Sequence, residues 1–102
     1  MSFPIGNYEF EGPFESADEL EDQAGVYAVM CERDDRIRLL DVGESAQVKT
    51  CVEGHEREPS WKKRCRGALF FGVHYTAHAQ QDERMEIEQE IRDEFNPPCG
   101  QD

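Results

Sequence analysis

Two segments in the first half of the chain have the composition of neighbouring β-strands. Residues 25–31 (GVYAVMC) and 36–42 (RIRLLDV) are rich in residues that favour strands. The polar segment 32–35 (ERDD) between them predicts a hairpin with a four-residue loop. Because residues 25–31 contain no charged side chain, we expect a central strand that is covered on both faces.

Two helical segments flank this hairpin. Ser16 and Glu19 form a capping box, which predicts a short helix that ends near Asp22. After the hairpin, Gly43 is expected to end the second strand, and a helix capped by a serine is expected over residues 45–54. One edge of that helix should be half buried, because valines recur along it.

The second half of the chain adds a third strand and a final helix. Residues 56–60 are expected to form a loop, followed by a short basic turn or helix that begins at Ser60. Residues 67–76 (GALFFGVHYT) predict a strand that is apolar on both faces. Residues 82–95 predict a helix with acids in its first turn, stopped by Pro97.

The final helix carries an acid on its apolar face. Ile87, Ile91 and Phe95 repeat at i, i+4 and i+8, and Glu88 and Arg84 fall within the same arc. A carboxylate in that position must be paired, hydrogen-bonded or bound to a cation. An ion pair with Arg84 or another base and a role as metal ligand or acid/base group both stay open.

Length and composition set outer limits on the protein. The 102 residues suffice for one domain. No apolar run is long enough to cross a membrane, and the N-terminus lacks the features of a secretory signal. We therefore expect a cytoplasmic protein with no membrane partner. The four cysteines contain no C-x-x-C pair, so free thiols are expected in preference to disulfides or a zinc site.

Charge is distributed unevenly along a chain whose formal net charge is −12. Residues 1–30 carry seven acids and no lysine or arginine, whereas residues 45–66 carry six basic residues against three acids. Nucleic-acid binding depends on neutralising phosphates with basic side chains. Nucleic acid is therefore a possible partner through residues 57–66, but the net charge disfavours it.

The order of these elements resembles the GIY-YIG domain. The resemblance covers residues 24–100 and depends on GVY in the first strand, DVGES at the end of the second, and EIEQEIRDEFNPPCG in the last helix. It extends, through DVGES, GHEREPSW and that last segment, to small bacterial GIY-YIG-like proteins of unassigned role. It implies an α+β fold with a central three-stranded antiparallel sheet flanked by helices. Residues 1–23 would be an N-terminal extension with a short helix, packed on the domain.

The resemblance also implies the chemistry of a metal-dependent nuclease and shows where this chain departs from it. Tyr27 matches the family's first tyrosine, and Glu88 matches the glutamate that binds a divalent cation, which would be Mg²⁺ or Mn²⁺. Asp41 stands where a second tyrosine is expected, and Cys51 stands where a helix arginine holds the phosphate. Glu44 stands where a lysine often follows the glycine. A further departure is Gly100 in place of an asparagine.

These matches and departures define the candidate site residues. The candidate catalytic residues are Tyr27, Asp41, Cys51, His55 and Arg57, and the candidate metal ligand is Glu88. A cation site rebuilt from four side chains is a second possibility: Asp41, Glu44, His55 and Glu88. A nearby Asp41 carboxylate should raise the pKa of Tyr27 above the ordinary value for tyrosine.

The basic segment supplies the candidate nucleic-acid contacts. They are Arg57, Trp61, Lys62, Lys63 and Arg64. Trp61 could stack on a base in a single-stranded nucleic acid. The other interpretation, which we favour, places Trp61 at the edge of the core beside solvated lysines.

Three functions are compatible with the sequence. The departures favour a GIY-YIG-like domain without efficient nuclease activity, acting as a binding or interaction module of unassigned role. The alternative is a divergent divalent-metal-dependent endonuclease that hydrolyses phosphodiesters, with Arg57 or Arg64 replacing the missing arginine. A third hypothesis is an acidic surface that mimics nucleic acid and occupies a DNA-binding protein.

Overall fold

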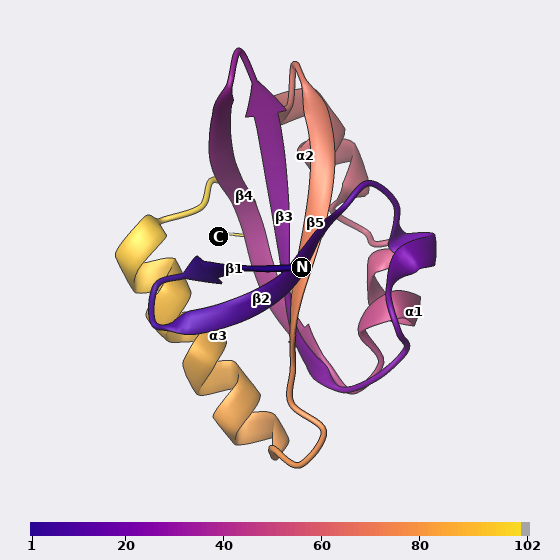
Figure 1. Cartoon of the computed structure of the whole chain (residues 1–102), viewed down its shortest axis with the longest axis vertical. Helices are drawn as coiled ribbons and strands as arrows, with labels where there is room; N and C mark the ends of the chain where they lie inside the picture. Colours follow the sequence, from indigo (N-terminus) through magenta and orange to yellow (C-terminus); the bar gives the residue numbers. More distant parts are fainter. Residues whose placement is uncertain (101–102) are drawn as a thin grey trace.

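A computed structural model describes residues 1–100 of the chain (Figure 1). Its strands are β1 (Ser2–Ile5), β2 (Tyr8–Phe14), β3 (Gly25–Arg33), β4 (Arg36–Ser45) and β5 (Ala68–Tyr75). A 3₁₀ turn, η1 (Ala17–Glu19), follows β2, and the helices are α1 (Val48–Val52), α2 (Glu58–Arg64) and α3 (Gln81–Phe95). The three strands and the later helices expected from the sequence are present with several different boundaries, but the short helix expected after Ser16 is only the 3₁₀ turn η1.

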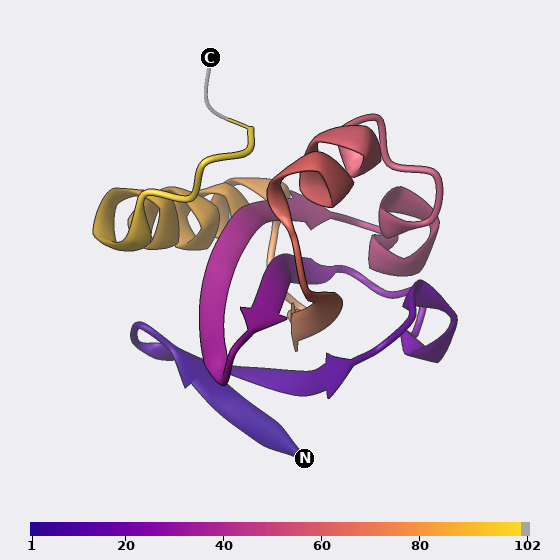
Figure 2. The same cartoon turned by 90° about the horizontal axis from the view of Figure 1, so that it is seen from above.

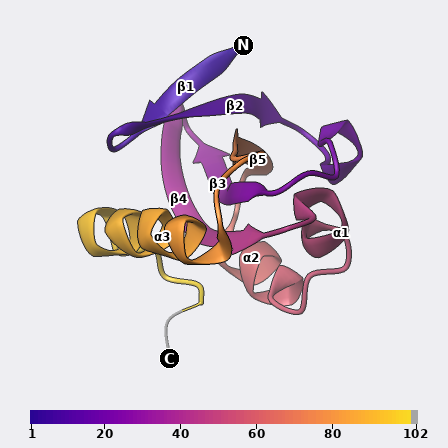
Figure 3. The ribbon, with the colours of Figure 1, turned by 90° about the horizontal axis from the view of Figure 1, so that it is seen from below.

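The sheet is larger than the sequence suggested. Its strand order is β1-β2-β5-β3-β4, and each neighbouring pair is antiparallel. The five strands curl into an open half-barrel, with α1 and α2 on one flank and α3 on the other (Figures 2 and 3). The prediction of a central three-stranded sheet flanked by helices is therefore wrong, because the N-terminal segment adds two strands.

The N-terminal segment was expected to be an extension with a short helix, but it contains the two additional strands. In β2, polar and apolar residues alternate, and Phe10 is buried while Glu9 and Glu11 on either side of it are exposed. This is the pattern of a strand with one face towards the core and one towards water. The density of acids in the segment concealed the alternation. The capping box at Ser16 is confirmed, but it caps only the three residues of η1.

Strand β3 is covered on both faces, as expected. Tyr27 and Val29 point into an apolar cluster formed with α1, α2 and β5. Val26 and Ala28 point into a second cluster, which includes Ile91 of α3 and the buried residues of β1 and β2. Strand β4 likewise contributes Leu40 to the first cluster and Val42 to the second, so β3 and β4 together join the two halves of the core.

The hairpin between β3 and β4 is tighter than predicted. Its loop contains only Asp34 and Asp35, both with positive φ, where a four-residue loop was expected. Strand β4 also continues past Gly43 to Ser45. Gly43 faces Tyr27 across the two strands, and a Cβ on Gly43 would overlap the Tyr27 ring. The glycine is required there because the tyrosine ring lies across its backbone.

Two further expectations for the middle of the chain need correction. Helix α1 begins at Val48 and is shorter than predicted, while α2 begins at Glu58 with Pro59 in its first turn, where a loop was expected. Within residues 1–100, no helix has the length and apolar character needed to cross a membrane.

Two of the four cysteines form a disulfide. Cys31 in β3 is bonded to Cys65 at the end of α2, and their Cα atoms lie 5.6 Å apart. Cys51 and Cys99 are free thiols, and Cys99 is buried. The expectation of four free thiols is therefore wrong. The fold brings together two cysteines that are 34 residues apart, a separation that carries no spacing signal.

Candidate functional site

Most of the predicted site residues line one cavity of about 500 Å³. We call it the Tyr27 cavity. It lies where β3 and β4 meet the segment between α1 and α2, and α3 contributes one side chain. The predicted residues that line it are Tyr27, Glu44, Cys51, His55, Arg57 and Glu88. Asp41 does not line it.

A short hydrogen bond joins two of these side chains. The Oη atom of Tyr27 lies 2.7 Å from Nε2 of His55. The backbone N–H of Arg57 donates to Nδ1 of the same imidazole at 2.9 Å. Because Nδ1 accepts, the neutral ring carries its proton on Nε2 and donates it to the tyrosine oxygen. The loop after α1 therefore fixes both the tautomer and the position of His55.

The electrostatic environment keeps both groups uncharged. Burial raises the pKa of Tyr27 far above its ordinary value, the nearby Cys51 thiol raises it further, and Asp41 adds a smaller effect that Arg57 opposes. Burial also lowers the pKa of His55, as does the positive charge of Arg57. The expected direction for Tyr27 is confirmed, but burial is a larger cause than Asp41. A tyrosine in this state is a weak proton acceptor at neutral pH.

Asp41 is the most heavily bonded carboxylate among the described residues, and its side chain is 0% exposed. Its Oδ2 accepts from Nε of Arg57 at 2.7 Å and from Nε1 of Trp61 at 2.8 Å. Its Oδ1 accepts from Nη2 of Arg92 at 2.9 Å and from the backbone N–H of Val42 at 2.9 Å. We call Asp41, Arg57, Trp61 and Arg92 the Asp41 cluster.

Arg92 was not predicted, although it completes this cluster. Its guanidinium donates to Asp41, to Glu88, and to the backbone carbonyl oxygens of Val42 and Cys99. It therefore ties the end of α3 and the C-terminal segment to β4. Arg92 follows Glu88 by four residues, and this spacing alone could have suggested an ion pair between them.

Glu88 lines the Tyr27 cavity but is not free. Its Oε2 accepts from Nε of Arg92 at 3.0 Å, and its side chain is 25% exposed. Arg84, the partner considered from the sequence, pairs instead with Glu44 at 3.0 Å, and both of those side chains are nearly buried. The ion-pair interpretation of Glu88 thus holds with a different arginine.

These residues do not fit a divalent cation. Two of the carboxylates that line the cavity, Glu44 and Glu88, each bind an arginine, and Arg57 adds a further positive charge. Across residues 1–100, no three His, Cys, Asp or Glu side chains are grouped closely enough to hold a metal ion. The rebuilt site that includes Asp41 is not assembled, because Asp41 is enclosed by its own cluster.

The predicted nucleic-acid residues do not form one exposed surface. Arg57 points to Asp41, and Trp61 is 1% exposed and lies in the core, as we favoured. Lys62 forms an exposed ion pair with Glu58, while Lys63 and Arg64 are exposed on α2. A base therefore has no access to the Trp61 ring.

Comparison with known proteins gives no match to this chain, either among family models, among curated proteins or among solved structures.

Proposed function

We propose that this protein is a GIY-YIG-like domain with a degenerate active site, which acts as a binding module and does not hydrolyse phosphodiesters efficiently. The observation that carries the proposal is the Asp41 cluster. Asp41 stands where the resemblance places a second tyrosine, and its two carboxylate oxygens bind Arg57 and Arg92. The guanidinium groups closest to the cavity are therefore already paired with Asp41 and Glu88 and do not supply the positive charge that phosphoryl transfer needs.

The charges around the Tyr27 cavity support the same conclusion. Glu53 and Glu56 lie on its lining and form no ion pair among residues 1–100, whereas Arg57 is the one arginine that lines it. A phosphodiester would meet more negative than positive charge there. A partner that presents a cation or hydrogen-bond donors matches the cavity better.

One observation favours the alternative of a divergent nuclease. Tyr27, Arg57 and Glu88 come from three separate elements and line the same open cavity. If Arg57 were released from Asp41 on substrate binding, these three groups would resemble the family's catalytic set. This second function needs a metal site that the present side-chain arrangement does not offer.

A nuclease assay with matched variants separates the two functions. Labelled single- and double-stranded DNA and RNA are incubated with the protein and either Mg²⁺ or Mn²⁺. We expect no cleavage above the rate of the metal alone, and no saturable change in the amide spectrum around Glu88 as metal is added. Cleavage that is lost in Glu88→Gln and kept in Glu86→Gln, an exposed acid on the same helix, would overturn the proposal.

A further inference from the structure

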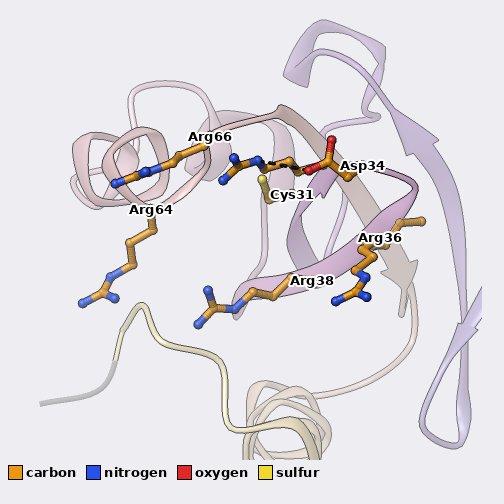
Figure 4. A pocket seen from close by; sticks show the side chains of 8 residues that line it. Cys31, Asp34, Arg36, Arg38, Arg64 and Arg66 are labelled. Atoms are coloured by element: carbon orange, nitrogen blue, oxygen red, sulfur yellow. Dashed lines mark ion pairs between the residues drawn. The ribbon is translucent and has the colours of Figure 1, made fainter.

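A second cavity, of about 750 Å³, lies where the β3–β4 hairpin meets the end of α2 (Figure 4). It is separate from the Tyr27 cavity, and no residue lines both. Five arginines line it: Arg33, Arg36, Arg38, Arg64 and Arg66. We call it the arginine pocket. In a chain with a net charge of −12, nearly half of the 11 basic residues gather around this one hollow.

Most of these arginines have no acidic partner. Arg33 forms an exposed ion pair with Asp34, the one acid in the lining, at 3.5 Å. In the part of the chain from residue 1 to 100, the other four arginines form no ion pair. All four are exposed, so water screens their mutual repulsion, but their hydrogen-bonding groups stay available to a ligand.

The arginines that line the pocket come from two walls, the β3–β4 hairpin and the segment at the end of α2. Arg36 and Arg38 alternate along β4 and so project from the same face of the strand. Arg64 and Arg66 flank Cys65, and the disulfide to Cys31 ties that wall to β3.

Close backbone packing reinforces the disulfide. Gly67 lies so near Glu32 that a Cβ on the glycine would overlap the Glu32 carbonyl. The start of β5 is therefore held against the end of β3. The distance between the two walls is fixed by a covalent bond and by close backbone packing before any ligand arrives.

We propose that the arginine pocket binds a compact anion that carries two or more phosphate groups. A planar guanidinium donates two parallel hydrogen bonds to a phosphate, and arginine is the side chain best suited to this geometry. Several arginines facing one hollow can contact adjacent phosphates at once. The cavity volume also falls within the range of small-molecule sites, roughly 300–1,000 Å³.

The charge of the surrounding surface favours a compact ligand over a long polyanion. Glu32 and Asp35 flank the pocket on the hairpin, and the N-terminal strands and α3 are rich in exposed acids. A nucleic acid that extends beyond the pocket would meet this negative surface and be repelled. A small polyphosphate places its charge within the pocket alone.

Calorimetric titration with defined anions, together with NMR spectra of the backbone amides, tests the proposal. The probes are inorganic tripolyphosphate, ATP with metal chelated, a short single-stranded DNA and a glutamate-rich peptide. We expect saturable binding of tripolyphosphate, with amide shifts confined to residues 31–38 and 64–67. The double variant Arg38→Gln with Arg64→Gln should weaken it by about tenfold or more. The control Lys49→Gln with Lys62→Gln removes the same charge outside the pocket and should leave the affinity within about twofold.

The outcomes separate the possible ligands. Tighter binding of ATP than of tripolyphosphate would support a nucleoside polyphosphate, and equal binding would support an inorganic polyphosphate. Binding of the DNA or the acidic peptide in preference to tripolyphosphate would overturn the proposal. So would an equal loss of affinity in the lysine control, or no binding of either phosphate compound. None of these results depends on the nuclease assay.

Discussion

Arg57 and Arg92 differ from the arginines of the arginine pocket in what their guanidinium groups contact. Arg57 and Arg92 share the buried carboxylate of Asp41, and Arg92 also donates to two backbone carbonyls. Arg36, Arg38, Arg64 and Arg66 form no ion pair in residues 1–100 and face an open hollow. The same side chain therefore serves the fold in one region and is free for a ligand in the other.

This contrast changes where a phosphate should be sought on the molecule. The resemblance directs attention to the Tyr27 cavity, where a nuclease would hold its substrate. Arg57 and Arg92 in that region are not available to a substrate, because Asp41 binds both of them. The arginines without an ion-pair partner among residues 1–100 lie in the arginine pocket.

Removing the carboxylate of Asp41 should have the largest effect. The variant Asp41→Ala leaves Arg57 and Arg92 without their shared partner, and Arg92 has a side chain only 12% exposed. We expect the free energy of unfolding to fall by about 3–5 kcal/mol, measured by urea denaturation. Asp93→Asn, which changes an exposed acid on α3, is the control and should stay within about 0.5 kcal/mol of the wild type. A loss below about 1 kcal/mol in Asp41→Ala would show that the cluster contributes little to folding.

Lowering the pH should reduce the stability of the protein by a smaller amount, through the protonation of His55. The folded state lowers the pKa of His55 from its ordinary value of 6.5, through burial and the charge of Arg57. Above that value the imidazole is neutral in the folded and unfolded chain alike. As the pH falls below it, the unfolded chain takes up a proton that the folded protein resists, so stability decreases.

The variant His55→Gln isolates this contribution. We expect the unfolding free energy of the wild type to fall more between pH 7.5 and pH 5 than that of His55→Gln. Equal pH dependence in the two proteins would argue against a buried neutral imidazole. Carboxylates elsewhere titrate in both proteins, so the difference between the two curves is the relevant quantity.

Changes in the arginine pocket should have the smallest effect on stability. Arg38→Gln and Arg64→Gln each remove an exposed charge with no ion-pair partner, and each should leave the unfolding free energy within about 0.5 kcal/mol of the wild type. Arg92→Gln makes the same chemical change in the Asp41 cluster and should cost about 2 kcal/mol or more. Similar losses of stability in the arginine pocket and in the Asp41 cluster would show that the two sets of arginines do not differ in their contribution to folding.

Periodicity alone identified the parts of the fold that depend on local pattern. The apolar run of β3 predicted a strand covered on both faces, and this is confirmed. The repeat of Ile87, Ile91 and Phe95 predicted the buried face of α3 at Ile87 and Ile91, but Phe95 is 44% exposed. The same helical pattern also predicted that Glu88 faces the core side of α3. The N-terminal strands were missed because acidic residues concealed the alternation in β2 and because β1 has only four residues.

The remaining features depend on contacts between distant segments. Asp41 meets an arginine 16 residues later and another 51 residues later, and no local pattern relates the three. The disulfide and the arginine pocket likewise combine β3 and β4 with the end of α2. Charge counts showed that residues 45–66 are basic. They could not show that the hairpin arginines share the same hollow.

The position of Cys99 between the two groups of arginines has a consequence for sulfur chemistry. Burial raises the pKa of the Cys99 thiol, the Asp41 carboxylate raises it further, and the charges of Arg64, Arg57 and Arg38 partly oppose this. A thiol attacks a disulfide only as the thiolate, so Cys99 is a poor nucleophile towards the Cys31–Cys65 bond. The carboxylate that binds two arginines also helps to protect the disulfide against exchange with this thiol.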